Sequence, residues 1–400
     1  MIAGEGIHLT YCSNIHPGET WPEVRRNLET FVPRVRDRVA PGKLFGIGLR
    51  LSARAADELG AGTALDELLG FLRANGLYVF TLNGFPYGPF HGVPVKSEVY
   101  RPDWRDPERL RYTNGLADLL ARLLPADTAM TGSLSTVPGA FKEDLRGEGD
   151  VDAIAQNLVR HVAHLVELER RTGRIIATAL EPEPCCMLET IDETVAFFRR
   201  HVFTPASTRL LGSLTGLDRI EAGQALRRHL GLCLDLCHAA VEFEDLDAGL
   251  AKLADTGVSI FKVQISAGLR IDRFDADTLS ALRAYEDPVY LHQVVEDGPE
   301  GLRRFVDLPE AFASLAGGAT PREWRVHFHV PVFHDDLGRF RSTRDFIAKA
   351  LARQRSQAVS DHLEIETYTW GVLPEALRAS AVDEAIAREF EWVLLQELQA

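Results

Sequence analysis

The chain has 400 residues, of which 46% are hydrophobic and 26% charged, and its formal net charge is −14. This size and composition are typical of a globular protein with one large domain or two ordinary ones. The acidic balance argues against nucleic acid or an anionic membrane as partner, because both attract basic surfaces. No run reaches the ~18 apolar residues of a membrane helix, so membrane insertion is not expected.

The N-terminal residues and the cysteines indicate the compartment. MIAGEGIHLTYC has neither the basic stretch nor the apolar stretch of a secretory signal, which favours a cytoplasmic protein. Five cysteines in this length, two of them adjacent (Cys185 and Cys186), do not form a disulfide framework.

Apolar runs alternate with helical patterns through the N-terminal half. Gly76 is expected to cap the second helix. A long segment rich in Pro, Gly and aromatic residues, 86–104, suggests a functional lid or simple packing in equal measure. The predicted strands are 6–12, 44–52, 77–85 and 129–138, and the predicted helices are 21–38, 64–76, 108–124 and 151–173.

The same alternation continues in the second half, with strands at 174–181, 230–236 and 258–266 and helices at 189–202, 220–230 and 247–257. Strands that alternate with helices in this way predict a parallel sheet. We therefore predict an α/β fold, a single (β/α)8 TIM barrel over residues 1–400.

Two further strand candidates, 325–333 and 362–370, bring the count to nine for eight places in the ring. Residues 267–324 are therefore expected to form an insertion after strand seven. Residues 290–308 resemble a hairpin around Asp297-Gly298. Either this hairpin or 325–333 is expected to lie outside the ring.

Polar residues share one face of each strand in the C-terminal part, since residues two apart in a strand point the same way. Such residues are costly to bury without partners or a metal ion. The matching positions are Ala177, Ala179, Glu181 and Glu183; Cys233, Asp235 and Cys237; Lys262, Gln264 and Ser266; His327 and His329; Glu364 and Glu366.

Asp235 ends a strand and His238 follows three residues later. This spacing lets a carboxylate and an imidazole approach one ion; the alternative is a buried hydrogen-bonded pair. Glu181 and Glu366 at neighbouring strand ends favour the metal, and oxygen and nitrogen ligands together suit Mn, Zn, Co or Mg.

The segments ALEPEP, LDLCHAA, the strand ending at Gln264 and the final IET resemble the xylose-isomerase-like TIM-barrel superfamily, which includes sugar isomerases, ketose 3-epimerases and endonuclease IV-type nucleases. GIHLTYCSNIHPGETW, FGIGLRLS, VYRPDW and HFHVPVF resemble EboE, the "metabolite traffic" family of the Ebo operon, over nearly the whole chain. That family is named for an operon role in moving or making a secondary metabolite.

The resemblance implies a ligand set. Glu181, with Glu183 as alternate, Asp235 and Glu366 match the superfamily's metal carboxylates, and His238 faces substrate. Gln264 stands where the superfamily usually has a histidine. An amide oxygen is a weaker ligand, so His327 or His329 is expected to compensate, His329 as a ligand and His327 toward substrate.

Other polar residues near strand ends are candidates for substrate contact or for loop packing. Phe90 and Trp104 could add an apolar wall. Lys262 could act as acid or base, or pair with a barrel carboxylate. The substrate-contact candidates are His8, Asn14, His16, Arg50, Asn83, Tyr87, His91, Glu183 and His327.

These observations predict a metal-dependent isomerase or epimerase for a small polyhydroxylated metabolite, with Glu181, Glu366, His238 and Lys262 in catalysis. The first alternative is a phosphodiesterase of the endonuclease IV kind, against which Gln264 and the acidic charge weigh. The second is a non-catalytic barrel that binds a metabolite and passes it to operon-encoded partners. A homo-oligomer is a further open alternative.

Overall fold

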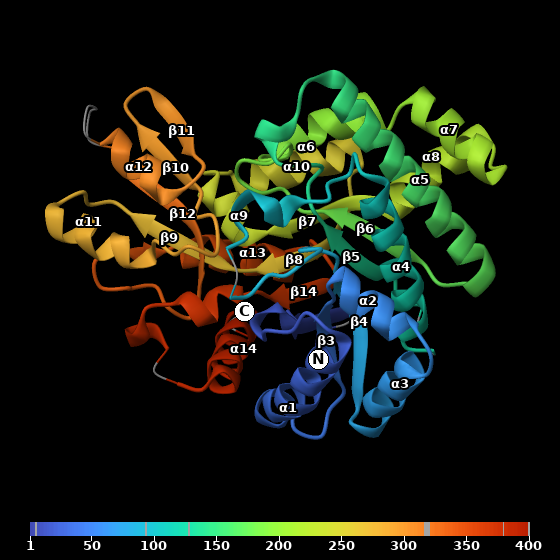
Figure 1. Cartoon of the computed structure of the whole chain (residues 1–400), viewed down its shortest axis with the longest axis horizontal. Coiled ribbons are helices and arrows are strands. Elements are labelled where there is room, and N and C mark those ends of the chain that lie inside the picture. Colours follow the sequence, from blue (N-terminus) through green and yellow to red (C-terminus); the bar gives the residue numbers. More distant parts are fainter. Residues whose placement is uncertain (5, 93, 127–128, 316–320, 379, 399–400) are drawn as a thin grey trace.

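Eight parallel strands form a barrel, and helices cover its outer surface (Figure 1). The computed structural model describes residues 1–400 except 5, 93, 127–128, 316–320, 379 and 399–400. A short strand, β1 (Ile2–Gly4), pairs antiparallel with the first barrel strand. The barrel strands are β2 (Ile7–Tyr11), β3 (Phe45–Arg50), β4 (Leu77–Asn83), β5 (Gly132–Thr136), β6 (Ile176–Leu180), β7 (Leu230–Asp235), β8 (Ile260–Ile265) and β14 (His362–Ile365).

The ring closes between β2 and β3 through a side chain. The Thr10 hydroxyl donates to the Gly46 carbonyl at 2.8 Å and accepts from the Gly48 amide at 3.0 Å. Together with one parallel bridge between Cys12 and Gly48, these bonds join the two end strands of the sheet.

The helices bury one apolar face against the strands. In α1, for example, Val24, Leu28, Val32 and Val35 recur at helical spacing and are all buried. Thr20 and Glu23 form a capping box at its first turn. The helices around the barrel are α1 (Trp21–Val39), α2 (Ala53–Gly60), α3 (Ala64–Ala74), α4 (Pro107–Leu123), α5 (Glu148–Thr172), α6 (Ile191–Phe197), α7 (Pro205–Thr215), α8 (Arg219–His229), α9 (Leu236–Val241), α10 (Leu246–Thr256), α13 (Arg344–Ser356) and α14 (Val382–Leu398).

A second, antiparallel sheet is inserted after the seventh barrel strand, as expected, and projects to the upper left in Figure 1. Its order is β11-β10-β12-β9-β13. Its elements are β9 (Ala267–Ile271), α11 (Ala276–Leu282), β10 (Val294–Gly298), β11 (Gly301–Phe305), α12 (Leu308–Ser314), β12 (Glu323–Val330) and β13 (Arg341–Ser342).

This second sheet holds both segments that competed for a place in the ring. β10 and β11 form the expected hairpin, and the HFHV run lies in β12, which pairs with β9 and β10. The inserted sheet therefore continues past residue 324. One residue, Ser266, separates β8 from β9, so the chain passes directly from the barrel into the insertion.

A polar layer fills the barrel interior. Lys262 Nζ lies 2.6 Å from Glu364 Oε2, and both side chains are fully buried. Asn83 accepts from Lys262 at 2.7 Å and donates to Glu364 at 3.0 Å. Gly48 makes room for this layer, because a Cβ there would lie 1.8 Å from Glu364 Oε1.

Among the helices that the structure describes, none is both long enough and apolar enough to cross a membrane.

Candidate metal centre

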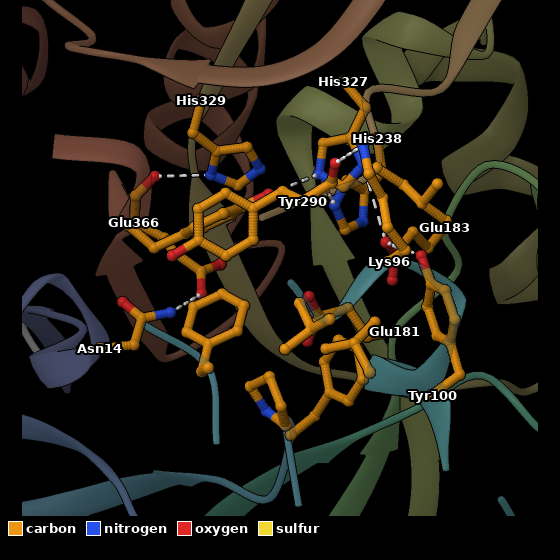
Figure 2. Close-up of a pocket in the computed structure, with 17 residues that line it drawn as sticks. Asn14, Lys96, Tyr100, Glu181, Glu183, His238, Tyr290, His327, His329 and Glu366 are labelled. Carbon is orange, nitrogen blue, oxygen red and sulfur yellow. Dashed lines mark hydrogen bonds and ion pairs between the residues drawn. The ribbon is translucent and has the colours of Figure 1, made fainter. Parts of the chain in front are cut away.

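A pocket opens at the C-terminal ends of the barrel strands, the end where TIM barrels carry their sites (Figure 2). It encloses about 520 Å³ of empty space, part of it open to solvent. Its polar residues come from the ends of β6 and β14, from α9 and from the inserted strand β12. They are Glu181, Glu183, His238, His327, His329 and Glu366, together with Asn14 from the turn after β2 and Lys96 from the 86–104 segment.

The Asp235–His238 spacing is that of a helix cap. Asp235 ends β7 and is the N-cap of α9, and its Oδ1 accepts from the His238 amide at 2.9 Å. The same oxygen accepts from the Ser266 hydroxyl at 2.7 Å. The cap turns the His238 side chain back toward the strand end, where its Nε2 lies 3.9 Å from Asp235 Oδ1.

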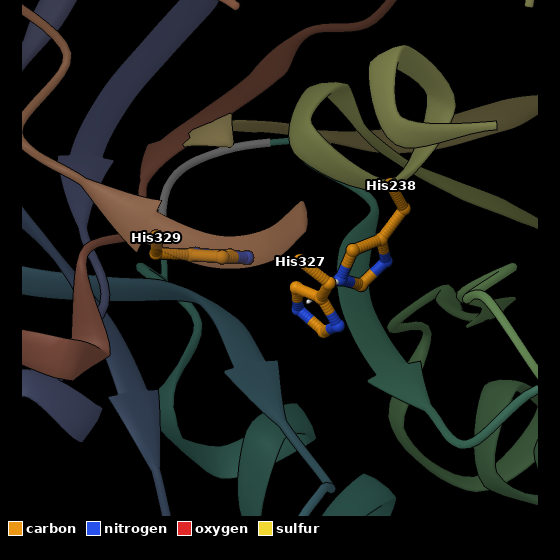
Figure 3. Close-up of side chains that lie close together, drawn as sticks. All are labelled: His238, His327 and His329. Atoms are coloured by element: carbon orange, nitrogen blue, oxygen red, sulfur yellow. Dashed lines mark hydrogen bonds between the residues drawn. The ribbon is translucent and has the colours of Figure 1, made fainter. Parts of the chain in front are cut away.

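Three buried imidazoles point toward one another (Figure 3). His238 Nδ1 lies 2.9 Å from the Pro182 carbonyl oxygen, and His329 Nδ1 lies 2.9 Å from the Glu366 carbonyl oxygen. A carbonyl oxygen can only accept, so both Nδ1 atoms carry the hydrogen, and each Nε2 keeps its lone pair when the ring is neutral. His327 Nδ1 likewise lies 2.8 Å from an oxygen, Gln293 Oε1.

When the rings are neutral, none of the three Nε2 atoms carries a hydrogen. His238 Nε2 and His327 Nε2 are 3.1 Å apart, and the ligand atoms of His238, His327 and His329 all lie within 4.8 Å of one another. His329 Nε2 and Asp235 Oδ2 are buried and make no hydrogen bond in the described structure. Buried acceptors without donors are costly, and a cation among them removes the cost.

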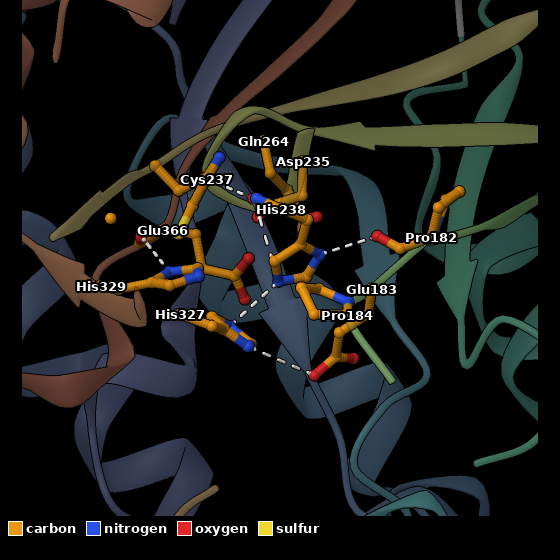
Figure 4. A network of polar contacts seen from close by, with 12 residues as sticks. Pro182, Glu183, Pro184, Asp235, Cys237, His238, Gln264, His327, His329 and Glu366 are labelled. Carbon is orange, nitrogen blue, oxygen red and sulfur yellow. Dashed lines mark hydrogen bonds and ion pairs between the residues drawn. The ribbon is translucent and has the colours of Figure 1, made fainter. Parts of the chain in front are cut away.

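Asp235 connects the imidazoles to the carboxylates (Figure 4). Its ligand atoms fall within 4.8 Å of those of Cys237 and His329 in one group, and of those of Glu181 and His238 in another. Burial raises the pKa of the Cys237 thiol well above its usual value, so a thiolate ligand is disfavoured. Imidazoles with a carboxylate suit Zn or Co better than Mg.

The carboxyl groups of the pocket hold protons readily. Burial raises the pKa of Glu181 to about 8; His238 opposes this shift and Asp235 adds to it. Burial raises the pKa of Glu366 well above its usual value, and the charges of Glu181 and Asp235 add to the effect. Asn14 donates to Glu366 Oε1 at 2.7 Å. Such carboxyls can serve as acid or base near neutral pH, and a bound cation lowers their pKa values.

Two of the imidazoles are neutral, as metal ligands must be. Burial lowers the pKa of His329 to about 4 and that of His327 well below its usual value. Burial also opposes the charged form of His238, but Asp235, Glu183 and Glu181 outweigh it and raise its pKa. The pKa of His238 is therefore the highest of the three rings.

Three predicted site residues lie below the pocket, in the polar layer of the barrel: Asn83, Lys262 and Gln264. Lys262 is committed to Glu364 and Asn83, so its expected role as acid or base is corrected to that of a buried ion pair. Gln264 accepts from the Cys233 thiol at 3.1 Å and faces Asn83 at 3.5 Å. The described residues that line the pocket do not include Gln264, which leaves its expected place as a ligand without support.

The residues expected on the N-terminal loops pack those loops and do not line the pocket. Arg50 pairs with Glu19 at 2.9 Å and donates to backbone carbonyls. His91 lies 3.9 Å from the same Glu19. The Tyr87 hydroxyl donates to Glu108 at 2.6 Å.

His16 and His8 lie elsewhere. His16 stacks on Phe31 with ring centroids 4.2 Å apart and lies 3.2 Å from the Tyr11 hydroxyl. His8 contacts the Tyr78 hydroxyl at 2.8 Å near the N-terminal ends of the strands, opposite the pocket. Neither residue lines the pocket, which corrects their expected contact with a substrate there.

An aromatic roof covers the polar floor. Phe90 lies 5.0 Å from Tyr290 and 5.2 Å from Tyr368 between ring centroids. Lys96 Nζ ties the 86–104 segment to the insertion, donating to the Tyr290 carbonyl at 2.6 Å and to Asp307 Oδ2 at 2.7 Å. Phe90, Lys96 and Tyr100 of the 86–104 segment line the pocket.

Sequence reasoning missed four residues of this site: Tyr100, Gln293, Tyr290 and Tyr368. Tyr100 and Gln293 lie 193 positions apart in sequence, and their contact is a hydrogen bond of 2.8 Å. A pattern of alternating residues carries no trace of such a contact. Trp104, expected in the wall, donates to Thr136 at 3.2 Å and is fully buried.

No protein-family model matches the chain, and no curated protein matches it. Solved structures do. The zinc-bound IolI protein is 15% identical over 98% of this chain and 100% of its own, with a TM-score of 0.50. A magnesium-bound xylose isomerase-like TIM barrel protein from Mycobacterium smegmatis is 14% identical over 99% and 98%, with a TM-score of 0.49. A D-tagatose 3-epimerase-like protein is 10% identical over 98% and 100%, with a TM-score of 0.48.

At these identities the likeness concerns the fold. The predicted TIM barrel with an insertion after strand seven is confirmed by the order of the strands, and the fold is similar to that of IolI.

Proposed function

We propose that the protein is a metal-dependent enzyme that isomerises or epimerises a small polyhydroxylated metabolite. One observation carries the proposal: the ligand atoms of His238, His327 and His329 lie within 4.8 Å of one another, and Asp235 lies within that distance of His238 and of His329. Neither His329 Nε2 nor Asp235 Oδ2 has a donor in the described structure. These four residues are the proposed ligands of one divalent ion. This set keeps Asp235 and His329 from the sequence prediction, and His238 and His327 take the places of Glu181, Gln264 and Glu366.

The ion, when bound, acts as a Lewis acid toward a carbonyl or hydroxyl of the substrate. Glu181 and Glu366 then take the acid and base roles, because their raised pKa values let them hold a proton near neutral pH. Asn14 orients Glu366 through its 2.7 Å hydrogen bond. Glu183, held by the Tyr100 hydroxyl at 2.6 Å, is placed to accept a hydrogen bond from a substrate hydroxyl.

The pocket lining argues against a phosphodiester. Among the described residues that line it, Lys96 is the one lysine or arginine, and it is bound to Asp307 and to two backbone carbonyls. Phosphate esters are usually held by free arginine or lysine side chains. An uncharged polyol or keto compound therefore fits better than a nucleic acid.

The EboE resemblance suggests that this metabolite is a secondary metabolite that the products of an operon make or move. The aromatic roof of Phe90, Tyr290 and Tyr368 favours a second candidate, a barrel that binds such a metabolite and passes it on without reaction. Proton exchange separates the two candidates, because a carrier leaves the carbon–hydrogen bonds of its cargo intact.

The test is incubation of zinc- or cobalt-loaded protein in D2O with D-fructose, D-tagatose and a keto-cyclitol, followed by mass spectrometry. The proposal predicts deuterium at the carbon next to the carbonyl of at least one compound. Asp235→Asn should lose the ion, and Glu366→Gln should keep the ion and slow exchange by about 10²–10⁴-fold.

Glu389→Gln is the matched control, because Glu389 is also buried with a pKa raised to about 7 but does not line the pocket. Its exchange rate should equal that of the parent protein. Binding of a compound without exchange in the metal-loaded protein would favour the carrier instead.

A further inference from the structure

The inserted sheet builds one half of the candidate metal centre. His327 and His329 lie on β12, and Gln293 directly precedes β10, its neighbour in the sheet. The His327 amide also donates to the Gln293 carbonyl at 2.9 Å, so the two backbones are joined at this point. We infer that Gln293 is a positioning residue that holds His327 in the tautomer whose Nε2 can bind an ion. This inference rests on the proposed function for the presence of the ion.

The Gln293 side chain is buried and makes three polar contacts. Nε2 donates to the Tyr100 hydroxyl at 2.8 Å and to the Pro184 carbonyl at 3.2 Å. Oε1 lies 2.8 Å from His327 Nδ1. No atom of the amide is spare, so its orientation is determined by its neighbours.

The Pro184 carbonyl fixes that orientation. A carbonyl oxygen only accepts, so the amide nitrogen must face it and the amide oxygen must face His327. His327 Nδ1 is then the donor. The Tyr100 hydroxyl agrees with this direction, because it accepts from Gln293 and donates its own hydrogen to Glu183 at 2.6 Å.

The other tautomer would close the site. With its hydrogen on Nε2, His327 would donate across the 3.1 Å gap to His238 Nε2. The two rings would then be hydrogen-bonded to each other, and neither Nε2 lone pair could bind an ion. Gln293 prevents this pairing by accepting the hydrogen at Nδ1.

Of the three groups that accept from the Nδ1 atoms, Gln293 is the one that a substitution can remove. His238 and His329 donate to the backbone carbonyls of Pro182 and Glu366, which every variant keeps. His327 donates to a side chain. Partners of this kind commonly change metal affinity by 10–100-fold when they are removed.

The first measurement needs neither an ion nor a substrate. Long-range ¹H–¹⁵N correlation spectra of metal-free protein with labelled histidine report the tautomer, with His327→Asn to assign the signals. The parent protein should show His327 as the Nδ1–H tautomer. Gln293→Leu and Gln293→Met should shift it toward Nε2–H, and Gln293→Glu, which keeps an acceptor oxygen, should restore Nδ1–H.

The second measurement is zinc affinity by competition with a chromophoric chelator. Gln293→Leu and Gln293→Met should bind zinc about 10–100-fold more weakly than the parent, and Gln293→Glu within about tenfold of it. Gln264→Leu is the matched control: it removes another buried glutamine, one that contacts Cys233 and Asn83, and should leave zinc affinity unchanged.

An Nε2–H tautomer of His327 in the metal-free parent protein overturns the inference, whatever the variants do. Equal zinc affinity in Gln293→Leu, Gln293→Met and the parent also overturns it. If the parent protein binds no zinc but shows the Nδ1–H tautomer, the proposed function fails and the role of Gln293 in fixing that tautomer stands.

Discussion

At the scale of single residues, burial separates the polar side chains of the barrel into two layers. Asp235, Glu181 and Glu366 line or adjoin the pocket and have raised pKa values or an unpartnered oxygen. Glu364, two residues before Glu366, and Lys262 on β8 lie deeper in the barrel and satisfy each other. Residues on one face of a strand therefore have different roles according to their depth.

Lys262 provides a test of this division. Lys262→Met leaves the Glu364 charge buried without its partner, which should lower the free energy of unfolding by about 3–5 kcal/mol. The double variant Lys262→Met/Glu364→Leu removes both charges and should recover most of that loss. Urea denaturation measures both. A stable Lys262→Met protein without proton exchange would instead assign Lys262 to the chemistry.

At the scale of elements, the barrel strands could be predicted because each is an apolar run that ends in a turn or a helix. The predicted segment 6–12 contains β2 (Ile7–Tyr11), and 77–85 contains β4 (Leu77–Asn83). The helix α9 could not be read this way, since its six residues follow β7 without a loop. The Asp235 cap is the local signal for it.

The site was predicted in part for a related reason. Strand alternation placed Glu181, Asp235 and Glu366 together, because parallel strands bring their C-terminal ends to one edge. The same pattern could not separate Asp235 from Cys233 or Lys262 by depth. It also could not bring β12 to the rim, because β12 lies outside the ring and reaches the pocket through pairing with β9 and β10.

The close contact between Gly48 of β3 and Glu364 of β14 predicts how a larger residue at position 48 affects stability. Gly48→Ala would place a Cβ 1.8 Å from Glu364 Oε1, so it should destabilise the protein by about 2–3 kcal/mol or more. Gly115→Ala is the control, because Gly115 lies in α4 with open space around it and should stabilise the protein by about 0.5–1 kcal/mol. Thermal unfolding compares them. Equal stability of the two variants would show that β3 and β14 do not meet as described.

At the scale of the whole molecule, several histidines are buried in the neutral form. Burial lowers the pKa of His16, His161 and His362 to about 3 in each case. The unfolded chain binds protons at these rings near pH 6.5, and the folded chain does not. These rings therefore lower the stability of the fold below that pH and have no such effect above it.

The sign of the pH dependence follows from this difference. As pH falls from 6.5 toward 3, the unfolded state gains protons first, so the free energy of unfolding should fall by roughly 4–5 kcal/mol for each such ring. His161→Gln, which can keep the contacts to Asn114 and Thr178, should make the slope shallower by about 1.4 kcal/mol per pH unit. Urea titrations from pH 4 to 7 give the slope, and an unchanged slope would contradict the neutral state of His161.

The insertion and the barrel together create the centre on which the functional account depends, since His327 and His329 come from one and Asp235 and His238 from the other. The most direct measurement is the X-ray absorption spectrum of the zinc-loaded protein. It should show zinc bound by three imidazoles and one oxygen donor, with bond lengths of about 2.0–2.1 Å. A single imidazole among carboxylate oxygens, or no bound zinc, would contradict the account.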